Sequence, residues 1–292
     1  MLKSFTPLMV ERQGVQLHTR VAGVGAPVLL LHGHPQTMSM WHRVAPVLAQ
    51  SHRVVLMDLR GYGDSSRPEA DAEHRNHSKR EMAQDALAVM KAHGFDRFDV
   101  LAHDRGARVG HRLAVDAPEA VNRLLLLDIA PTLAMYENTS EAFARAYWHW
   151  FFMIQPSPLP EALIESDPAR YVRSVIGARY AGLQAFAPEA LAEYERCAAL
   201  PGTALSIAED YRASASLDLA HDRADVAAGH KLQQPLRVLW GNHGAVGRCF
   251  DVLGLWRERA AQVTGYALDS GHYLAEEAPE QVIAQAQQFF TH

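Results

Sequence analysis

The sequence contains very little cysteine. Its 292 residues include two cysteines, Cys197 and Cys249, which form neither a CxxC pair nor a cluster at metal-ligand spacing. A disulfide framework and a cysteine nucleophile are therefore disfavoured. The simpler interpretation is that both are buried or incidental thiols of a protein from a reducing compartment.

Long hydrophobic runs and a strong charge imbalance are also missing. No apolar run approaches the ~20 residues that span a bilayer, and the first residues show no signal-like apolar core. The formal net charge of -5 is mildly acidic, which argues against a nucleic-acid-binding surface. We therefore expect a soluble cytoplasmic protein with neither a membrane nor a nucleic-acid partner. Any anion-binding site must then be built by local arginines.

Along the chain, short apolar runs alternate with segments that have helical spacing of apolar residues. The chain is long enough for one large α/β domain with an insertion, and residues 8–22 alternate loosely around Gly14, which indicates a β-hairpin. This alternation predicts a mostly parallel sheet with helices on both faces. Strands are predicted at 27–31, 53–58, 98–102, 123–128, 235–240 and 263–268, and helices at 79–93, after 104, around 250–261 and at the end of the chain, closing near Phe290.

Between residues 131 and 221 the pattern changes. Short strand-like runs disappear, and aromatic and helical stretches such as FARAYWHWFF and ALAEYERCAAL are separated by prolines. We interpret this segment as a helical cap inserted into the α/β core. The expected organisation is a first core part at 1–130, the cap at 131–221 and a second core part at 222–292.

One stretch, 99–113 (DVLAHDRGARVGHRL), has the pattern of a buried strand that turns sharply into a helix. Ala102, Gly106 and Ala107 are small, as a strand-to-helix elbow requires when it holds its central residue above the sheet. That central residue is Asp104, where serine is the familiar nucleophile. A carboxylate needs no base to deprotonate it at neutral pH, and it can attack a saturated carbon to form an ester. The alternative is that Asp104 caps the N-terminus of the helix.

Five motifs in chain order carry a family resemblance. The chain resembles the haloacetate dehalogenase family of α/β-hydrolases, which includes the fluoroacetate dehalogenases. The resemblance covers nearly the whole chain and implies an α/β-hydrolase fold, with a mostly parallel eight-stranded sheet and an inserted helical cap. The motifs are HGHPQ (32–36), DLRGYGDSS (58–66), HDRGAR (103–108), LDIAP (127–131) and SGHYLAEEAPE (270–280), of which HDRGAR, together with YWHW (147–150) in the cap, is the most specific.

His272 follows the last predicted strand, where α/β-hydrolases place their general base. With a carboxylate nucleophile, this base would activate water against the enzyme ester. A carboxylate should orient the base, and Asp128, directly at a strand end, is our choice, because the loop after Trp240 has no acid until Asp251. The alternatives are an ordinary loop histidine at 272 and a helix cap at Asp128.

Arg105 and Arg108 flank the predicted nucleophile on neighbouring helical positions. Paired guanidinium groups suit bidentate capture of a carboxylate, and the resemblance assigns both to the carboxylate of the substrate. From the residues alone, two surface arginines or a partner for Asp104 would be the favoured interpretation. The oxyanion donors should be the backbone N–H groups of Arg105 and His34. Relatives usually carry Phe at position 34.

Three cap residues match the halide-binding positions of the family: His149, Trp150 and Tyr211. Each offers a polar hydrogen, as a departing halide requires when water is excluded. Without the resemblance, an aromatic core of the cap is the simpler interpretation. His32 and His34 lack further ligands at usable spacing, so no metal site is expected.

The sequence thus predicts an enzyme that hydrolyses carbon–halide bonds in short 2-haloacids, with haloacetate and water giving glycolate and halide through an aspartyl ester. No cofactor is expected, and the resemblance implies a homodimer. Whether fluoride leaves, or chloride and bromide alone, depends on the volume of the pocket. The alternatives are an epoxide hydrolase that uses Tyr147 and Tyr211 as acids, and a ligand-binding α/β-hydrolase without turnover.

Overall fold

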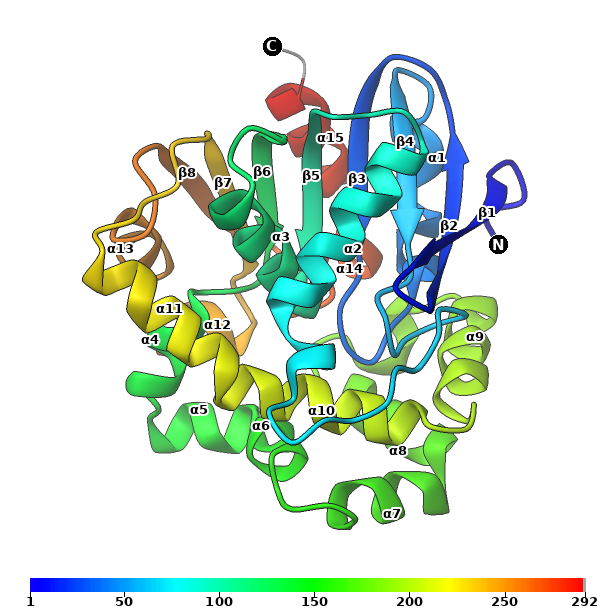
Figure 1. Cartoon of the computed structure of the whole chain (residues 1–292), viewed down its shortest axis with the longest axis vertical. Helices are drawn as coiled ribbons and strands as arrows, with labels where there is room; N and C mark the ends of the chain where they lie inside the picture. Colours follow the sequence, from blue (N-terminus) through cyan, green and yellow to red (C-terminus); the bar gives the residue numbers. More distant parts are fainter. Residues whose placement is uncertain (291–292) are drawn as a thin grey trace.

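The chain folds around one eight-stranded sheet, and the computed structural model describes residues 1–290 (Figure 1). The strands lie in the order β1-β2-β4-β3-β5-β6-β7-β8. They are β1 (Thr6–Arg12), β2 (Val15–Ala22), β3 (Ala26–Leu31), β4 (His52–Met57), β5 (Phe98–His103), β6 (Val121–Leu127), β7 (Leu236–Gly241) and β8 (Val263–Leu268). β1 and β2 form an antiparallel hairpin and β2 is antiparallel to β4, whereas the other neighbouring pairs are parallel. The predicted hairpin and strands are confirmed.

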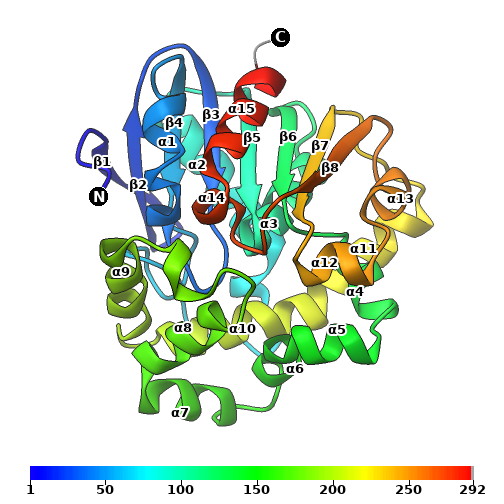
Figure 2. The ribbon, with the colours of Figure 1, turned by 180° about the vertical axis from the view of Figure 1, so that it is seen from behind.

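Helices cover both faces of the sheet. α2 (Lys79–Ala92) and α3 (Asp104–Asp116) lie on the face seen in Figure 1, and α1 (Ala45–Leu48) with α15 (Pro279–Phe290) lies on the face seen in Figure 2. The shorter helices of the core are η1 (Met38–His42), η2 (Arg75–His77), α12 (Ala245–Cys249), α13 (Val252–Arg257) and α14 (Leu274–Glu277).

The helix predicted around 250–261 is present but shorter than predicted. α13 covers Val252–Arg257. The side chain of Asp251 accepts a hydrogen bond from the backbone N–H of Gly254 at 3.0 Å and caps the start of the helix. Asp251 is therefore occupied as a helix cap.

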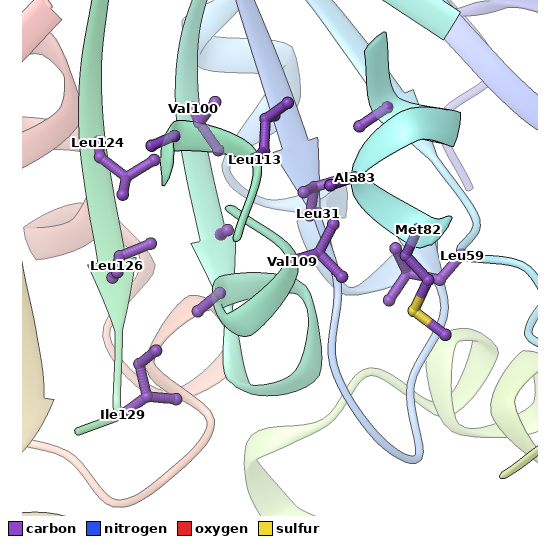
Figure 3. Packing of buried hydrophobic residues seen from close by; sticks show 14 of the residues in the cluster. Leu31, Leu59, Met82, Ala83, Val100, Val109, Leu113, Leu124, Leu126 and Ile129 are labelled. Carbon is purple, nitrogen blue, oxygen red and sulfur yellow. The ribbon is translucent and has the colours of Figure 1, made fainter. Parts of the chain in front are cut away.

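The inner strands are continuous apolar runs because both of their faces are buried. Figure 3 shows Val100, Leu124 and Leu126 of β5 and β6 in one cluster with Val109 and Leu113 of α3. All five side chains are fully buried, and burial of a side chain of this size contributes roughly 1.5–3 kcal/mol. This packing fixes the carboxyl ends of the strands relative to the start of α3.

The cap lies between β6 and β7. Figures 1 and 2 show its helices gathered beyond the carboxyl ends of the parallel strands, the edge where α/β sheets place their ligand sites. α11 runs past residue 221, the expected end of the cap, to Ala227. Within residues 1–290, no helix has both the length and the apolar character needed to cross a membrane. The cap elements are α4 (Thr132–Glu137), α5 (Glu141–Ala146), α6 (Trp148–Met153), α7 (Leu159–Ser166), α8 (Pro168–Gly177), η3 (Gly182–Ala185), α9 (Pro188–Ala198), α10 (Thr203–Ala215) and α11 (Leu217–Ala227).

Candidate active site

Asp104 lies at the sharp turn between β5 and α3. It is the first residue of α3 and has a φ of 46°, in the left-handed region that residues with side chains rarely adopt. Gly106 permits the turn, because a Cβ atom there would lie 2.3 Å from the carbonyl oxygen of His32. Gly33 leaves room for the nucleophile, since a Cβ atom there would lie 2.5 Å from the Cβ of Asp104. The predicted elbow is present, with a strained residue at its centre.

The Asp104 carboxylate does not cap the helix. Its Oδ1 accepts a hydrogen bond from the backbone N–H of His34 at 3.0 Å. The residue before it, His103, occupies the cap position and makes no side-chain cap bond. Asp104 is 3 % exposed, so its carboxylate lies under the cap at the end of the sheet.

His272 and Asp128 meet Asp104 at this edge of the sheet. Nδ1 of His272 lies 2.6 Å from Oδ2 of Asp128, and Nε2 of His272 lies 3.9 Å from Oδ2 of Asp104. The backbone N–H of Gly241 donates to Oδ1 of Asp128 at 3.0 Å, which holds the carboxylate in place. The pairing with Asp128 leaves Nε2 to face the nucleophile. At 3.9 Å it is too far for a direct hydrogen bond.

Burial acts to raise the pKa of Asp104, but neighbouring groups outweigh it. His272 and His103 lower this pKa most. The positive guanidinium groups of Arg108 and Arg105 lower it further. The pKa of Asp104 is therefore held well below its ordinary value, and the carboxylate is ionised at neutral pH.

Arg105 is buried, and most of its donors are already engaged. Its Nε lies 2.9 Å from Oδ2 of Asp210, its Nη2 lies 2.6 Å from Oδ1 of the same carboxylate, and Nη2 also donates to Ser214. Asp210 accepts further hydrogen bonds from Lys79 and Tyr62. Nη1 of Arg105 is buried without a partner among residues 1–290. Arg105 is thus neither a surface residue nor the ion-pair partner of Asp104, and it retains one unengaged nitrogen.

Arg108 is also buried and belongs to a different set of contacts. Its Nη1 donates to Thr132 at 2.8 Å and to the carbonyl oxygen of Ala130 at 3.2 Å. The guanidinium carbon lies 4.7 Å from the ring centroid of Trp150. Nε of Arg108 has no hydrogen-bond partner within the described chain. Both arginines can therefore still donate to an anion, although they are held by separate partners.

Two of the three predicted halide-binding residues carry buried donors that nothing satisfies. Nε1 of Trp150 and the hydroxyl of Tyr211 have no hydrogen-bond partner in residues 1–290. A buried, unpaired donor costs roughly 1–3 kcal/mol, so such a pair calls for an acceptor. Burial, followed by the negative charge of Asp104, raises the pKa of Tyr211 well above its ordinary value, so the phenol keeps its proton.

His149 completes this group on α6. Its ring centroid lies 5.9 Å from that of Tyr211. The ring centroids of Trp150 and Tyr211 are 6.5 Å apart. Burial lowers the pKa of His149 well below its ordinary value, so its imidazole is neutral and has one N–H to donate.

His34 contributes more than its backbone. Its Nε2 lies 2.9 Å from the hydroxyl oxygen of Tyr171, and its ring packs near those of His149 and Tyr211 at centroid distances of 6.2 and 5.6 Å. Burial lowers the pKa of His34 to about 3, so the ring is neutral. Its Nδ1 is buried and unpaired in the described part of the chain. A polar ring therefore occupies a position where the family resemblance leads us to expect phenylalanine.

Several supporting residues were not predicted from the sequence. Asp210 and Ser214 hold Arg105, Lys79 donates to Asp210, and Tyr171 is paired with His34. The one local signal was the position of Asp210 directly before Tyr211. Residues 1–290 contain no cluster of three or more side chains that could ligate a metal ion. Nε2 of His32, one of the two histidines considered for such a site, accepts a hydrogen bond from the backbone N–H of Leu59.

Comparison with known proteins shows which family the chain belongs to. Residues 26–179 match the family model for the alpha/beta hydrolase fold. The chain is 38 % identical to a fluoroacetate dehalogenase from Burkholderia sp over 292 residues, which is 100 % of this chain and 95 % of that protein. It is 34 % identical to a soluble epoxide hydrolase from Corynebacterium sp. (strain C12), covering 95 % of this chain and 94 % of that protein.

Two solved structures resemble the whole chain. A proposed alpha/beta hydrolase from Nostoc sp PCC 7120 is 50 % identical, with a TM-score of 0.97 and complete coverage of both chains. A mutant of a proposed epoxide hydrolase from Pseudomonas aeruginosa with bound MFA is 39 % identical, with a TM-score of 0.93 and coverage of 100 % of this chain and 97 % of the other. The chain is a hydrolase that belongs to the haloacetate dehalogenase family of the alpha/beta hydrolases.

Proposed function

We propose that the protein hydrolyses short 2-haloacids to 2-hydroxyacids and halide through an ester of Asp104. The observation that carries the proposal is an ionised carboxylate at the elbow, flanked by two buried guanidinium groups that each keep an unengaged nitrogen. A small substrate that bears both a carboxylate and a leaving group satisfies these features together. Neither the nucleophile nor the base needs a cofactor for this chemistry.

In the first step Asp104 displaces the halide. Oδ1 is held by the backbone N–H of His34, so Oδ2 attacks the α-carbon while the carbon–halogen bond breaks and its electron pair leaves with the halide. Arg105 and Arg108 orient the substrate carboxylate. The departing halide accepts hydrogen bonds from His149, Trp150 and Tyr211. These hydrogen bonds replace the hydration that the halide lacks in a buried site.

In the second step water cleaves the ester. His272, oriented by Asp128, takes a proton from a water molecule at Nε2, and the water oxygen attacks the ester carbonyl carbon of Asp104. The negative charge that forms on Oδ1 is stabilised by the backbone N–H of His34 and, by our prediction, of Arg105. Collapse of this intermediate breaks the bond from the carbonyl carbon to Oδ2, which leaves as the hydroxyl oxygen of the product and takes up the proton held at Nε2 of His272. The 2-hydroxyacid then leaves and the carboxylate is regenerated.

The proposal is tested by halide release from fluoroacetate, chloroacetate and bromoacetate, measured with ion-selective electrodes, beside diol formation from styrene oxide. We expect halide and glycolate from at least one haloacetate. Epoxide hydrolysis is the second candidate, since the Tyr147 ring lies 6.1 Å from that of His272 and the hydroxyl of Tyr211 is unpaired. Diol formation without halide release would favour that candidate. Tight haloacid binding without product would indicate a binding protein.

Removal of one halide donor is expected to slow the release of fluoride more than that of bromide. Tyr211→Phe keeps the ring over Arg105 but loses the hydroxyl, and Trp150→Phe loses the indole N–H. A hydrogen bond to a charged group is worth about 1.5–3 kcal/mol, so first-turnover release should slow by about 10- to 100-fold. Fluoride, the most strongly hydrated halide, should show the larger loss. Equal losses for fluoride and bromide in rapid-quench measurements would contradict the assigned role.

The rate of the first step is expected to be independent of pH between roughly pH 5 and 9. Because the pKa of Asp104 lies well below its ordinary value, the carboxylate stays ionised as the pH falls through this range. The measurement is the rate constant of first-turnover halide release across the range, with circular dichroism as the check on folding. A loss of rate that follows the protonation of one group inside the range would contradict an ionised nucleophile.

A further inference from the structure

A cavity of about 400 Å³ lies beside the candidate active site. His149 and His272 of that site form part of its wall, and Arg145, Arg179 and Arg248 form another part. Its wall combines residues of α5 in the cap with residues of α12 in the core. These two helices are adjacent (Figure 2). Its volume is within the range of roughly 300–1,000 Å³ that small-molecule sites occupy.

The charge that lines this cavity is of one sign. Three arginines are present, and none of the described residues in its wall is an aspartate or a glutamate. The chain as a whole carries a formal net charge of -5, so its overall field repels anions. A local group of arginines reverses that field at one place on the surface.

Arg179 is the cation that links the cavity to the catalytic carboxylates. It follows α8, donates from Nη1 to the carbonyl oxygen of Ala146 at 3.1 Å, and lies with its guanidinium carbon 4.6 Å from the ring centroid of Tyr147. Burial acts to lower its pKa, but tyrosine neighbours and the charges of Asp128 and Asp104 raise it. Its charge is thus felt at the reaction centre.

The arginines differ in how far their charge is compensated. Arg145 forms an ion pair with Glu141 at 2.7 Å. Within residues 1–290, neither Arg179 nor Arg248 lies within ion-pair distance of a carboxylate. His243, which also lines the cavity, stacks on Tyr180 at a centroid distance of 4.0 Å and lies 2.9 Å from Asp269. Arg179 and Arg248 therefore hold the available positive charge.

We propose that this cavity, which we call the arginine vestibule (Arg145, Arg179 and Arg248 with His149 and His272), binds the carboxylate of a substrate before the substrate reaches Asp104. Arg179 and Arg248 contact the carboxylate there and then pass it to Arg105 and Arg108. This inference rests on the proposed function, because it assigns a second carboxylate site to the same substrate class. The vestibule would thus favour anions over neutral haloalkanes and epoxides.

The test compares kcat/KM for chloroacetate at several ionic strengths, set with sodium methanesulfonate, in the wild type and in Arg179→Gln, Arg248→Gln and the double variant. We expect kcat/KM of the wild type to fall by about 10-fold from low salt to roughly 0.3 M. The double variant should start about 10-fold lower at low salt and depend less on salt. The loss should fall mainly on KM, because Arg179 and Arg248 contact the substrate before it reaches Asp104, whereas the nucleophile, the base and both carboxylate-binding arginines are kept.

Arg170→Gln is the matched control. It removes the same charge from α8 at an exposed position that does not line the cavity. We expect its kcat/KM and salt dependence to match those of the wild type. If the vestibule variants behave like Arg170→Gln, or if their loss falls on kcat alone, the inference is overturned.

A binding experiment separates this inference from the proposed function. Acetate is titrated calorimetrically into the wild type and into the double variant, which needs no turnover. Weaker acetate binding by about 3- to 10-fold in the double variant supports the vestibule even if no haloacetate is hydrolysed. Equal affinity overturns it even if halide release is rapid. Halide release from the wild type, measured separately, decides the proposed function.

Discussion

Asp104→Asn is expected to lower steady-state halide release by about 10⁴-fold or more. The amide has almost the same shape, and its oxygen can still accept the hydrogen bond that Oδ1 of Asp104 receives from the backbone of His34. It carries no negative charge and cannot form the alkyl ester. The measurement is halide release from chloroacetate and bromoacetate over long incubations, with wild-type enzyme diluted to the same residual rate.

Two controls make this result interpretable. Circular dichroism and thermal unfolding show whether the variant keeps its fold, which we expect because the elbow is formed by Gly33 and Gly106 as well as by Asp104. Intact-mass measurement at the end of the assay shows whether the amide has hydrolysed back to the carboxylate. A folded variant that retains its amide and more than about a tenth of the wild-type rate would show that another group attacks the substrate.

His272→Gln is expected to release about one halide per active site and then stop, with steady-state turnover reduced by about 10⁴-fold. Arg108 and Arg105 still lower the pKa of Asp104 in this variant, so the nucleophile stays ionised and alkylation does not require the base. Hydrolysis of the ester does require it, because water must lose a proton as it attacks. The ester should therefore accumulate and appear as a carboxymethyl adduct on the peptide that contains Asp104.

The size of the burst tests the division of labour between the two residues. Rapid-quench halide measurement and peptide mass spectrometry should give equal amounts of released halide and adduct. Asp104→Asn, treated identically, should give neither. If His272→Gln shows no burst and no adduct while it remains folded, the base takes part in the first step. The two-step account would then be wrong.

The sequence predicted the sheet well because its inner strands are buried on both faces. Runs such as those around Leu29, Val55 and Leu125 are uniformly apolar, and their periodicity leaves little choice of structure. Helix boundaries were less predictable. α13 covers Val252–Arg257, a part of the predicted range 250–261, and α11 continues past residue 221. The ends of these helices depend on capping contacts and tertiary packing, which hydrophobic periodicity does not predict.

The catalytic positions were predictable to different degrees. Asp104 was found from its small neighbours, and its elbow is present. Asp128 was chosen because it directly ends a strand, and it lies beside His272, whereas the more distant Asp251 serves as a helix cap. The spacing of small residues and the order along the chain carry this information locally. For these three residues, sequence reasoning and geometry agree on the arrangement, and their chemical roles stay proposals.

The environment of the site was not predictable. Arg105 is held by Asp210, 105 positions away in the sequence, and His34 is joined to Tyr171 across 137 positions. No local pattern pairs residues at such distances. The structure also shows that the donors of Trp150 and Tyr211 are buried without a partner. Their sequence context did not predict this, because it suits an aromatic core equally well. The arginine vestibule combines cap and core segments for the same reason.

The most direct test of the account is a single turnover in water enriched in heavy oxygen, with enzyme in excess over chloroacetate. If Asp104 forms the ester, the new oxygen of glycolate comes from the carboxylate of the enzyme. The first-turnover glycolate should then be unlabelled, and the heavy isotope should be found in the peptide that contains Asp104. Labelled glycolate with an unlabelled peptide would mean that water attacks the substrate carbon directly. The carboxylate would then not be the nucleophile.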